Sequence, residues 1–318
     1  MGRISNFLNS LALAPGDEWQ IALRRKTDKT LLDGNGDGFS LIPNTFRYWY
    51  ADPFLFEYNG DTYIFAEMYD RTKKKGAIGW AIINGLQCTK FTVCLELEHH
   101  LSYPCIFRSG KDIYMVPECY QSGCVTLYRA TDFPNNWEKS KVLFNGLAVD
   151  TTPLSIDGTL KFITTVFANK EKRINNNLNI LDECGKNYQV ISSDYSSRCA
   201  GMPFCRGEKT YRPAQNCGEL YGSQIVFKEI IDDSLDNYKE ANVLTVGTAK
   251  TSGKVIVNLI NDPHKHTFVG IHTYNATDDY EVVDLKYLHS KSTIYFCKNL
   301  FSWIKVRIFG IKDNGIKQ

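Results

Sequence analysis

The stretch ADPFLFEYNGDTYIFAE (Ala51–Glu67) contains a proline, an apolar run, a glycine turn and a second apolar run. Three more copies of this pattern follow: SYPCIFRSGKDIYMVPE (Ser102–Glu118), DTTPLSIDGTLKFITT (Asp150–Thr165) and AGMPFCRGEKTYRPAQ (Ala200–Gln215). Each copy predicts two strands joined by a tight hairpin, because apolar runs separated by Asn-Gly, Ser-Gly or Asp-Gly favour such turns. The turn glycines are Gly60, Gly110, Gly158 and Gly207. They lie roughly fifty residues apart, which is the period of a β-propeller blade.

The repeat predicts an all-β fold, a five-bladed β-propeller that occupies residues 1–318 as a single domain. An alternating segment upstream of the first copy, Glu18–Arg24, is expected to complete the last blade and close the ring. The fifth unit is the least regular, and its predicted hairpin is Lys254–Asn275, with the turn at Asp262-Pro263. A propeller gathers the first ends of its inner strands around one central pocket, so functional residues are expected there.

The composition indicates an ordinary globular protein, with 23% charged and 43% apolar residues among 318. The net charge of +2 gives no indication of a nucleic-acid partner. No run of about 18 apolar residues occurs, so no membrane-spanning helix is predicted. The apolar run Leu8–Ala14 is interrupted by Asn9 and Ser10, which argues against a signal peptide.

Cysteine and histidine usage argues against a metal centre. Ten cysteines occur without a Cys-x-x-Cys pair, which favours a reducing cytoplasm over disulfides or a zinc site. The six histidines lack metal-ligand spacing, and glycine-rich nucleotide motifs are absent. We therefore expect neither a metal nor a cofactor.

The end of the chain, Lys298–Gln318, combines basic residues with Leu, Ile, Phe and Trp side chains. One interpretation is a last strand or helix that packs on the ring. The other is a contact with a membrane surface, because basic residues mixed with Trp and Phe suit the interface. The sequence leaves both open.

Carboxylates occupy equivalent places in the repeat. Asp52 precedes the first apolar run of blade one, and Asp150 holds the same place in blade three. Because inner strands start near the axis, both are expected to face the central pocket, where two carboxylates can divide acid, base and nucleophile roles. The alternative is that each aspartate only caps a turn. Glu67 and Glu118 form a second matched pair at the ends of second strands, unless they are merely solvated strand ends.

The candidates for substrate binding are polar residues: Glu67, His100, Tyr103, Arg212, Gln215, Tyr221 and His272. Arg212 is expected at the pocket mouth, where its guanidinium suits a phosphate or carboxylate; the alternative is an ordinary surface ion pair. Arg198 and Arg206 lie nearby in the sequence. A lone histidine is more often a hydrogen-bonded packing residue than a ligand, so His100 and His272 could also be structural.

Six motifs in this order resemble one known family: ADPF, HLSYP, the PE of IYMVPE, FPNNW, DTTP and YRPAQN-x4-YG. This family is the five-bladed propeller found at the N-terminus of plant glucosamine inositolphosphorylceramide transferases, and alone or fused in bacterial polysaccharide gene clusters. The resemblance covers about Trp49 to His272. The family's fold is similar to that of glycoside hydrolase family 43, whose members act on furanosides and related sugars. Some bacterial relatives act as glycosyltransferases that build furanose-containing surface polysaccharides from lipid-linked sugar phosphates.

The resemblance implies roles for individual residues. The general base of the hydrolases lies in an Asp-Pro motif that opens blade one, here Asp52, and their second aspartate resembles Asp150. The hydrolase acid is a glutamate that precedes a small residue and a proline, but the comparable segment here, Arg198–Pro203, has no carboxylate. A glycosidic alkoxide needs a proton from such an acid, whereas a sugar phosphate leaves as an anion and needs positive charge. The missing acid, together with Arg212, therefore favours transfer from a sugar phosphate.

On this basis Asp52 is expected to deprotonate the acceptor hydroxyl or to act as nucleophile, with Asp150 and Glu118 as the other catalytic carboxylates. The expected enzyme is a glycosyltransferase of surface polysaccharide (O-antigen, lipopolysaccharide) biosynthesis. It would transfer a furanosyl sugar, such as ribofuranose, from a lipid-linked sugar phosphate to an oligosaccharide acceptor, in the cytoplasm at the inner face of the cytoplasmic membrane. Two alternatives remain: a glycoside hydrolase with Glu118 as its acid, and a non-catalytic carbohydrate-binding propeller.

Overall fold

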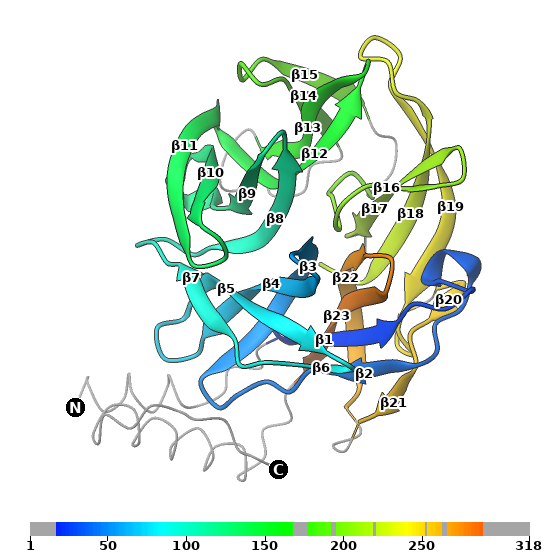
Figure 1. Cartoon of the computed structure of the whole chain (residues 1–318). Coiled ribbons are helices and arrows are strands. Elements are labelled where there is room, and N and C mark those ends of the chain that lie inside the picture. Colours follow the sequence, from blue (N-terminus) through cyan, green and yellow to red (C-terminus); the bar gives the residue numbers. More distant parts are fainter. Residues whose placement is uncertain are drawn as a thin grey trace, which may run out of the picture.

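The computed structural model confirms the predicted all-β fold: five sheets stand as blades in a ring (Figure 1). It describes residues 17–167, 177–191, 195–218, 221–251, 253–262 and 266–288. The basic and aromatic segment Lys298–Gln318 lies outside the described residues, so both interpretations of it stay predictions. Within the described part, no helix is long and apolar enough to cross a membrane.

Blades one to three follow the repeat directly. Blade one contains β3 (Tyr48–Tyr58), β4 (Asp61–Asp70) and β5 (Lys75–Asn84), and β5 also pairs with the short strands β6 (Gln87–Cys88) and β7 (Thr92–Leu95). Blade two contains β8 (Ser102–Ser109), β9 (Asp112–Glu118), β10 (Cys124–Asp132) and β11 (Asn136–Asn145). Blade three contains β12 (Leu147–Ile156), β13 (Thr159–Phe167), β14 (Asn177–Leu181) and β15 (Asn187–Ile191).

The last two blades each take in additional short strands. Blade four contains β16 (Phe204–Arg206), β17 (Lys209–Asn216), β18 (Gln224–Asp232), β19 (Lys239–Gly247) and β20 (Val255–Ile256). Blade five contains, in spatial order, β22 (Phe268–Ala276), β23 (Tyr280–Leu288), β1 (Asp17–Arg25), β2 (Phe39–Leu41) and β21 (Leu259–Asn261). Two short 3-10 helices, η1 (Leu31–Asp33) and η2 (Tyr120–Ser122), lie in connections.

The four predicted hairpins are confirmed at their turns. The repeated glycines all have φ between 59° and 87°, a range that other residues rarely adopt. Each glycine joins the first strand of its blade to the second, so the repeat in the sequence is the repeat in the structure.

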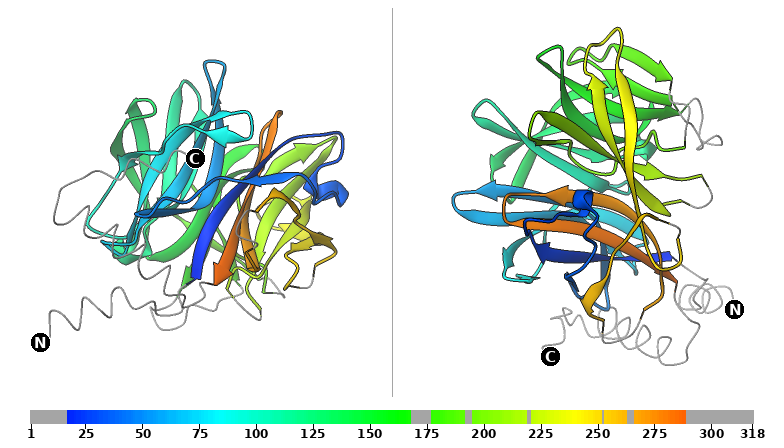
Figure 2. Two further views of the ribbon diagram at one scale, coloured as in Figure 1. Left: turned by 90° about the horizontal axis from the view of Figure 1, so that it is seen from below. Right: turned by 90° about the vertical axis from the view of Figure 1, so that its right-hand side faces the viewer.

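The N-terminal strand closes the ring, as predicted. β1 pairs along its whole length with β23, from Asp17 opposite Leu288 to Arg25 opposite Tyr280. Blade five then packs against blade one, with β22 and β23 beside β3 (Figure 2). A residue near the start of the chain is thereby brought into the same blade as residues near the end of the described part.

The predicted fifth hairpin is wrong. Val255–Ile256 pairs with β19 in blade four, and Leu259–Asn261 pairs with β2 in blade five, so this segment crosses between blades. The actual hairpin joins β22 to β23 through a turn in which the Thr277 backbone N–H donates to the Tyr280 carbonyl (2.9 Å). This turn, Thr-Asp-Asp-Tyr, has no glycine, and the Asp-Pro dipeptide upstream gave a stronger but misleading turn signal.

Candidate functional site

Inner strands of four blades bend at the same place. The strand register shifts between Ala51 and Phe54, between Ser102 and Cys105, between Val149 and Thr152, and between Ile271 and Tyr274. Each shift puts two residues opposite one, which is a β-bulge. Such bulges re-aim a side chain, and here the bulge residues include Asp52, Asp150 and His272, which were all predicted to line the pocket.

Three of the bulges hold a residue other than glycine in the left-handed region of backbone space. Asp52 has a φ of 50°, Tyr103 of 45° and Asp150 of 51°. Such a conformation costs about 1–3 kcal/mol per residue and persists only where the surroundings impose it, typically at functional sites. The left-handed conformation recurs at equivalent positions of three blades, so it is a systematic feature of this end of the ring.

The carboxylate of Asp52 is buried where blades one, two and five meet. Its Oδ2 accepts a hydrogen bond from the backbone N–H of Tyr103 (3.1 Å), and its Oδ1 accepts one from the Thr273 hydroxyl (2.9 Å). Burial raises the pKa of Asp52 to about 6, with His272 opposing the rise and Asp284 adding to it. A carboxylate with a pKa near the working pH suits a general base.

Behind Asp52 lies Asp284, which the sequence analysis missed. Asp284 is fully buried on β23 and accepts hydrogen bonds from the backbone N–H groups of Asp52 (2.9 Å), His272 (3.2 Å) and Thr273 (2.9 Å). Its Oδ2 also lies 2.7 Å from His272 Nδ1. One carboxylate therefore fixes the bulges of blades one and five against each other.

His272 stands between two carboxylates and against an aromatic ring. Its Nε2 lies 3.7 Å from Asp52 Oδ1, and its ring stacks on Trp19 with 3.6 Å between centroids and 11° between planes. Burial alone would lower the pKa of His272, but Asp284 and Asp52 outweigh burial and raise it. The geometry fits an imidazolium shared by two carboxylates. Trp19, contributed by β1, was not predicted as part of the site.

The same three side chains are close enough to approach one small cation, since ligand atoms of Asp52, His272 and Asp284 lie within 4.8 Å of one another. The Asp284 carboxylate already has partners, because it contacts the His272 imidazole and accepts from three backbone N–H groups. A cation would have to displace those contacts. A protonated His272 would supply the positive charge that two buried carboxylates require.

A second group of residues gathers around Asp150. Arg198 Nε lies 2.6 Å from Asp150 Oδ2, and Gln215 Nε2 donates to the same oxygen (3.0 Å). Arg198 also reaches Glu118, with 3.7 Å from Nη2 to Oε2. Burial raises the pKa of Glu118 well above its usual range, with Asp150 adding to the rise and Arg198 opposing it. The half-exposed ring of Tyr221 lies 5.2 Å from the Arg198 guanidinium and 5.6 Å from the His272 ring.

Glu67 and His100 form a third group beside Asp52. The pairing of Glu67 with Ala51 and of Glu118 with Ser102 confirms that the two glutamates hold equivalent places. Burial raises the pKa of Glu67 well above its usual range, with Asp52 and Glu118 adding to the rise. Burial lowers the pKa of His100 to about 4, so this imidazole is neutral at neutral pH.

The predicted position of Arg212 at the pocket mouth is wrong. Its guanidinium is fully buried within blade four and forms a two-pronged ion pair with Glu240, with distances of 2.5 Å and 2.7 Å. The exposed Arg206 pairs with Asp33 (2.5 Å) and also stays away from the central group. The arginine that meets the carboxylates is Arg198, which the sequence analysis noted only as a neighbour.

The predicted substrate contact of the Tyr103 side chain is also wrong. The phenol is fully buried, pairs with the Thr152 hydroxyl (2.8 Å) and accepts from the backbone N–H of Gly201 (2.8 Å). Tyr103 thus ties blade two to blade three and to the segment leading into blade four. Its contribution to the site is the backbone N–H that holds Asp52.

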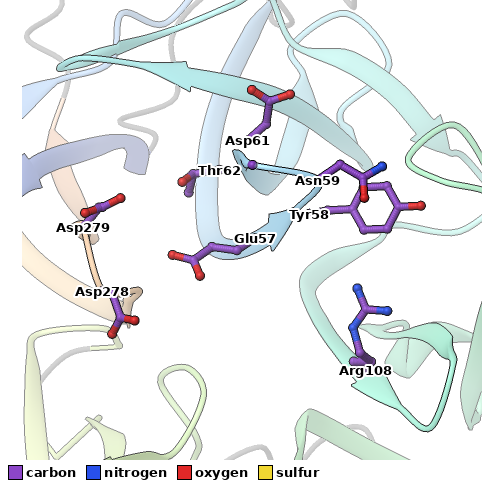
Figure 3. Close-up of a pocket in the computed structure, with 9 residues that line it drawn as sticks. Glu57, Tyr58, Asn59, Asp61, Thr62, Arg108, Asp278 and Asp279 are labelled. Carbon is purple, nitrogen blue, oxygen red and sulfur yellow. The ribbon is translucent and has the colours of Figure 1, made fainter.

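A cavity of about 440 Å³ lies elsewhere, at the hairpin ends of blades one and five (Figure 3). It is lined by residues in or beside the two turns, among them Glu57, Asp61, Asp278 and Asp279, together with Arg108. None of the predicted site residues lines it, because those residues lie toward the opposite end of the inner strands.

Comparison with known proteins identifies a family for most of the chain. Residues 42–269 match the family described as glucosamine inositolphosphorylceramide transferase 1, N-terminal. The glucosamine inositolphosphorylceramide transferase 1 of Arabidopsis thaliana is 29% identical over 235 residues, which cover 70% of this chain and 30% of that protein. The chain therefore matches less than a third of the length of this curated relative.

A solved structure with a TM-score above 0.5 shares the fold. The catalytic domain of the Coprinopsis cinerea GH62 alpha-L-arabinofuranosidase gives a TM-score of 0.51 at 10% identity, covering 78% of this chain and 98% of that domain. A GH43_1 enzyme from Xanthomonas citri complexed with xylotriose gives a TM-score of 0.49 at 11% identity, covering 77% of this chain and 88% of that chain. At these identities the likeness concerns the fold alone. The matched residues 42–269 show that the chain belongs to the family defined by the N-terminal domain of glucosamine inositolphosphorylceramide transferase 1.

Proposed function

We propose that this chain is a glycosyltransferase that moves a furanosyl sugar, such as ribofuranose, from a lipid-linked sugar phosphate to an oligosaccharide acceptor. The product would be a surface polysaccharide such as the O-antigen of lipopolysaccharide. One observation carries the proposal: Arg198 of blade four contacts Asp150 and approaches Glu118, in the segment where a hydrolase of this fold would be expected to hold its acid. The Arabidopsis relative is named as a transferase, which supports group transfer in general without indicating the donor or the acceptor.

In the proposed reaction, Asp52 accepts the proton of the acceptor hydroxyl while that oxygen attacks the anomeric carbon. The bond from the anomeric carbon to the phosphate oxygen breaks, and the phosphate keeps the electron pair. Arg198 stabilises the negative charge of the departing phosphate, taking the role expected for Arg212. Asp150 and Glu118 bind sugar hydroxyls or stabilise the positive charge that develops on the sugar ring.

A lipid-linked donor would bring the protein to a membrane surface, and we propose the inner face of the cytoplasmic membrane. The donor, the acceptor and the membrane surface are therefore the proposed partners, and nucleic acid is not among them. This part of the proposal rests on the charge and aromatic pattern of Lys298–Gln318 in the sequence.

The direct test is to incubate the purified protein with polyprenyl-phosphate-linked ribofuranose and an oligosaccharide acceptor. Mass spectrometry should detect a glycosylated acceptor and an equal amount of free lipid phosphate. Release of the sugar into water at the same rate with and without acceptor would contradict transfer.

Arg198 gives a sharper prediction. Replacing Arg198 with alanine should lower kcat with a sugar-phosphate donor by about a hundredfold to a thousandfold, as for loss of one preorganised charge stabiliser. The loss should be much smaller with a nitrophenyl furanoside, whose leaving group is already a stable anion. The matched control is Arg206→Ala, which removes an exposed arginine paired to Asp33. If both donors lost activity equally, Arg198 would only be positioning Asp150.

Glycoside hydrolysis is the second candidate, because burial raises the pKa of Glu118 well above its usual range and so favours the protonated acid. A neutral carboxylic acid can protonate a glycosidic oxygen as the bond breaks. Release of reducing sugar from a furanoside without any lipid donor, abolished by Glu118→Gln, would favour this candidate over transfer.

A further inference from the structure

Glu67 has a buried carboxyl oxygen that no described residue satisfies. Glu67 lies on β4 and pairs with Ala51, the residue before Asp52. Only 5% of Glu67 is exposed. Its Oε1 has no hydrogen-bond partner within the described part of the chain. Buried polar atoms are nearly always paired, and an unpaired one weakens the fold, so this oxygen calls for an explanation.

The nearest candidate partner stops short of a hydrogen bond. His100 Nε2 lies 3.5 Å from Glu67 Oε1, beyond the usual 2.7–3.2 Å range for N–H···O bonds. His100 Nδ1 accepts from the backbone N–H of Gly76 (3.0 Å), so the proton of the neutral ring sits on Nε2. The His100 side chain is 28% exposed, which opens the pair to solvent.

The two groups are spaced to share one hydroxyl. A donor N–H and an acceptor oxygen that lie 3.5 Å apart can both reach a single oxygen placed at ordinary hydrogen-bond distance from each. That oxygen would accept from His100 and donate to Glu67. The imidazole of His100 is neutral, and the carboxylates of Asp52 and Glu118 lie near Glu67, so the pair suits a neutral hydroxyl rather than an anion.

The surroundings favour a sugar as the source of the hydroxyl. The Tyr69 ring lies 6.0 Å from His100 and stacks on Trp49 at 4.5 Å, and aromatic rings bind the apolar faces of sugars. Gly76 leaves room at the pair, since a Cβ there would lie 2.7 Å from Glu67 Oε1. The unpaired oxygen also recurs in the repeat: Thr165, paired with Val149 as Glu67 is with Ala51, has a buried hydroxyl without a partner in the described part.

We propose that Glu67 and His100 form a subsite that binds one hydroxyl group of the carbohydrate substrate beside Asp52. The subsite rests on the proposed function, because it takes a sugar as the ligand. The sugar hydroxyl would then supply the hydrogen bond that Glu67 Oε1 does not receive from the described residues.

The test compares two buried glutamates of the full-length protein. Glu67 lacks a partner on Oε1, whereas the fully buried Glu281 pairs with Arg24 (2.6 Å) and with the Tyr274 hydroxyl (2.7 Å), away from the site. Replacing Glu67 with methionine should raise Tm by about 1–3 °C, because an unpaired polar group is removed. Replacing Glu281 with methionine should lower Tm, because its partners are left unpaired.

Binding is then measured by saturation-transfer NMR with methyl furanosides and methyl pyranosides of ribose, arabinose and xylose. Glu67→Met should weaken the best-bound sugar by about tenfold or more, while Glu67→Gln, which keeps an acceptor oxygen, should restore much of the affinity. A deoxy sugar that lacks the recognised hydroxyl should bind wild type and Glu67→Met equally.

Each remaining outcome overturns a distinct statement. A fall in Tm with Glu67→Met would make Glu67 a structural residue. A sugar that binds wild type and Glu67→Met equally, with every hydroxyl present, would remove the subsite and leave the proposed function standing. If no sugar of the panel binds wild type, the carbohydrate assignment itself is overturned, and the subsite with it.

Discussion

Replacing Asp52 with asparagine is expected to lower turnover by about a hundredfold to ten-thousandfold while leaving the fold intact. Asparagine tolerates the left-handed backbone at this position, where φ is 50°. Its amide can still accept from the backbone N–H of Tyr103, and the Thr273 hydroxyl can turn to accept from the amide nitrogen. What disappears is the negative charge that accepts a proton.

The measurement is the initial rate of acceptor glycosylation or, for the hydrolase alternative, of sugar release, alongside Tm. The matched control is Asp61→Asn, an exposed aspartate in the turn of the same hairpin, which should leave the rate unchanged. Wild-type turnover by Asp52→Asn would remove Asp52 from the reaction. Sugar binding that survives Asp52→Asn, with no turnover by wild type on any donor, would instead support the non-catalytic binding propeller.

The pH dependence follows from the same residue. Burial raises the pKa of Asp52 to about 6, and a base works only when it is deprotonated. The wild-type kcat/KM should therefore fall about tenfold per pH unit below this pKa and level off above it. A rate that stays constant down to about pH 4 would contradict Asp52 as the base, since an unperturbed carboxylate titrates there.

Much of this site could be predicted because its signals are local. The turn glycines mark the hairpins, and an aspartate just before a proline or threonine marks the first end of an inner strand. This pattern predicts equivalent places for Asp52 and Asp150, and both are bulge residues of inner strands. The bulges that turn these side chains were not predictable, because a bulge depends on which residues of two strands pair. The left-handed backbone of Asp52 is a consequence of that pairing.

The structure of blade four explains why the sequence pattern indicates Arg212, rather than Arg198, as the arginine of the site. Its inner strand β16 covers only Phe204–Arg206 and begins after the segment that carries Arg198. The repeat therefore marks the hairpin correctly but not the residue that meets the carboxylates. Arg212 lies within β17, and its partner Glu240 on β19 is twenty-eight positions away in the chain. A side chain's burial against a distant strand leaves no local trace in the sequence.

Asp284 was missed because its hairpin was misplaced. The sequence YEVVDLKYL (Tyr280–Leu288) carries one aspartate inside an apolar run, and a charged residue in a buried strand usually has a dedicated partner. That signal was available, but the predicted fifth hairpin ended at Asn275. Asp284 lies opposite the bulge of blade five, and Ala66 holds the equivalent position in blade one. Blade five therefore has a carboxylate, which holds the two bulges together, at a position where blade one has a small apolar residue.

Replacing Asp284 with alanine is accordingly expected to be the most destabilising change in the site, with a loss of about 3–5 kcal/mol in the free energy of unfolding. Three buried backbone N–H groups would lose their acceptor, and His272 would lose its nearest counter-charge. Asp284→Asn keeps one acceptor oxygen and should cost less. Urea unfolding measures both, with the exposed Asp278→Ala expected within about 0.5 kcal/mol of wild type.

The free energy of unfolding that Asp284→Ala loses should also depend on pH, in a direction set by His272. Its pKa is raised in the folded protein, so the stability it contributes is fully present below its unfolded pKa and is lost as pH rises through the folded value. Alanine at position 284 removes the main cause of that rise. The difference between wild type and Asp284→Ala should therefore be larger near pH 6 than near pH 9. A difference that stays constant would mean that Asp284 acts only through the backbone N–H groups of the two bulges, and that His272 is neutral beside it.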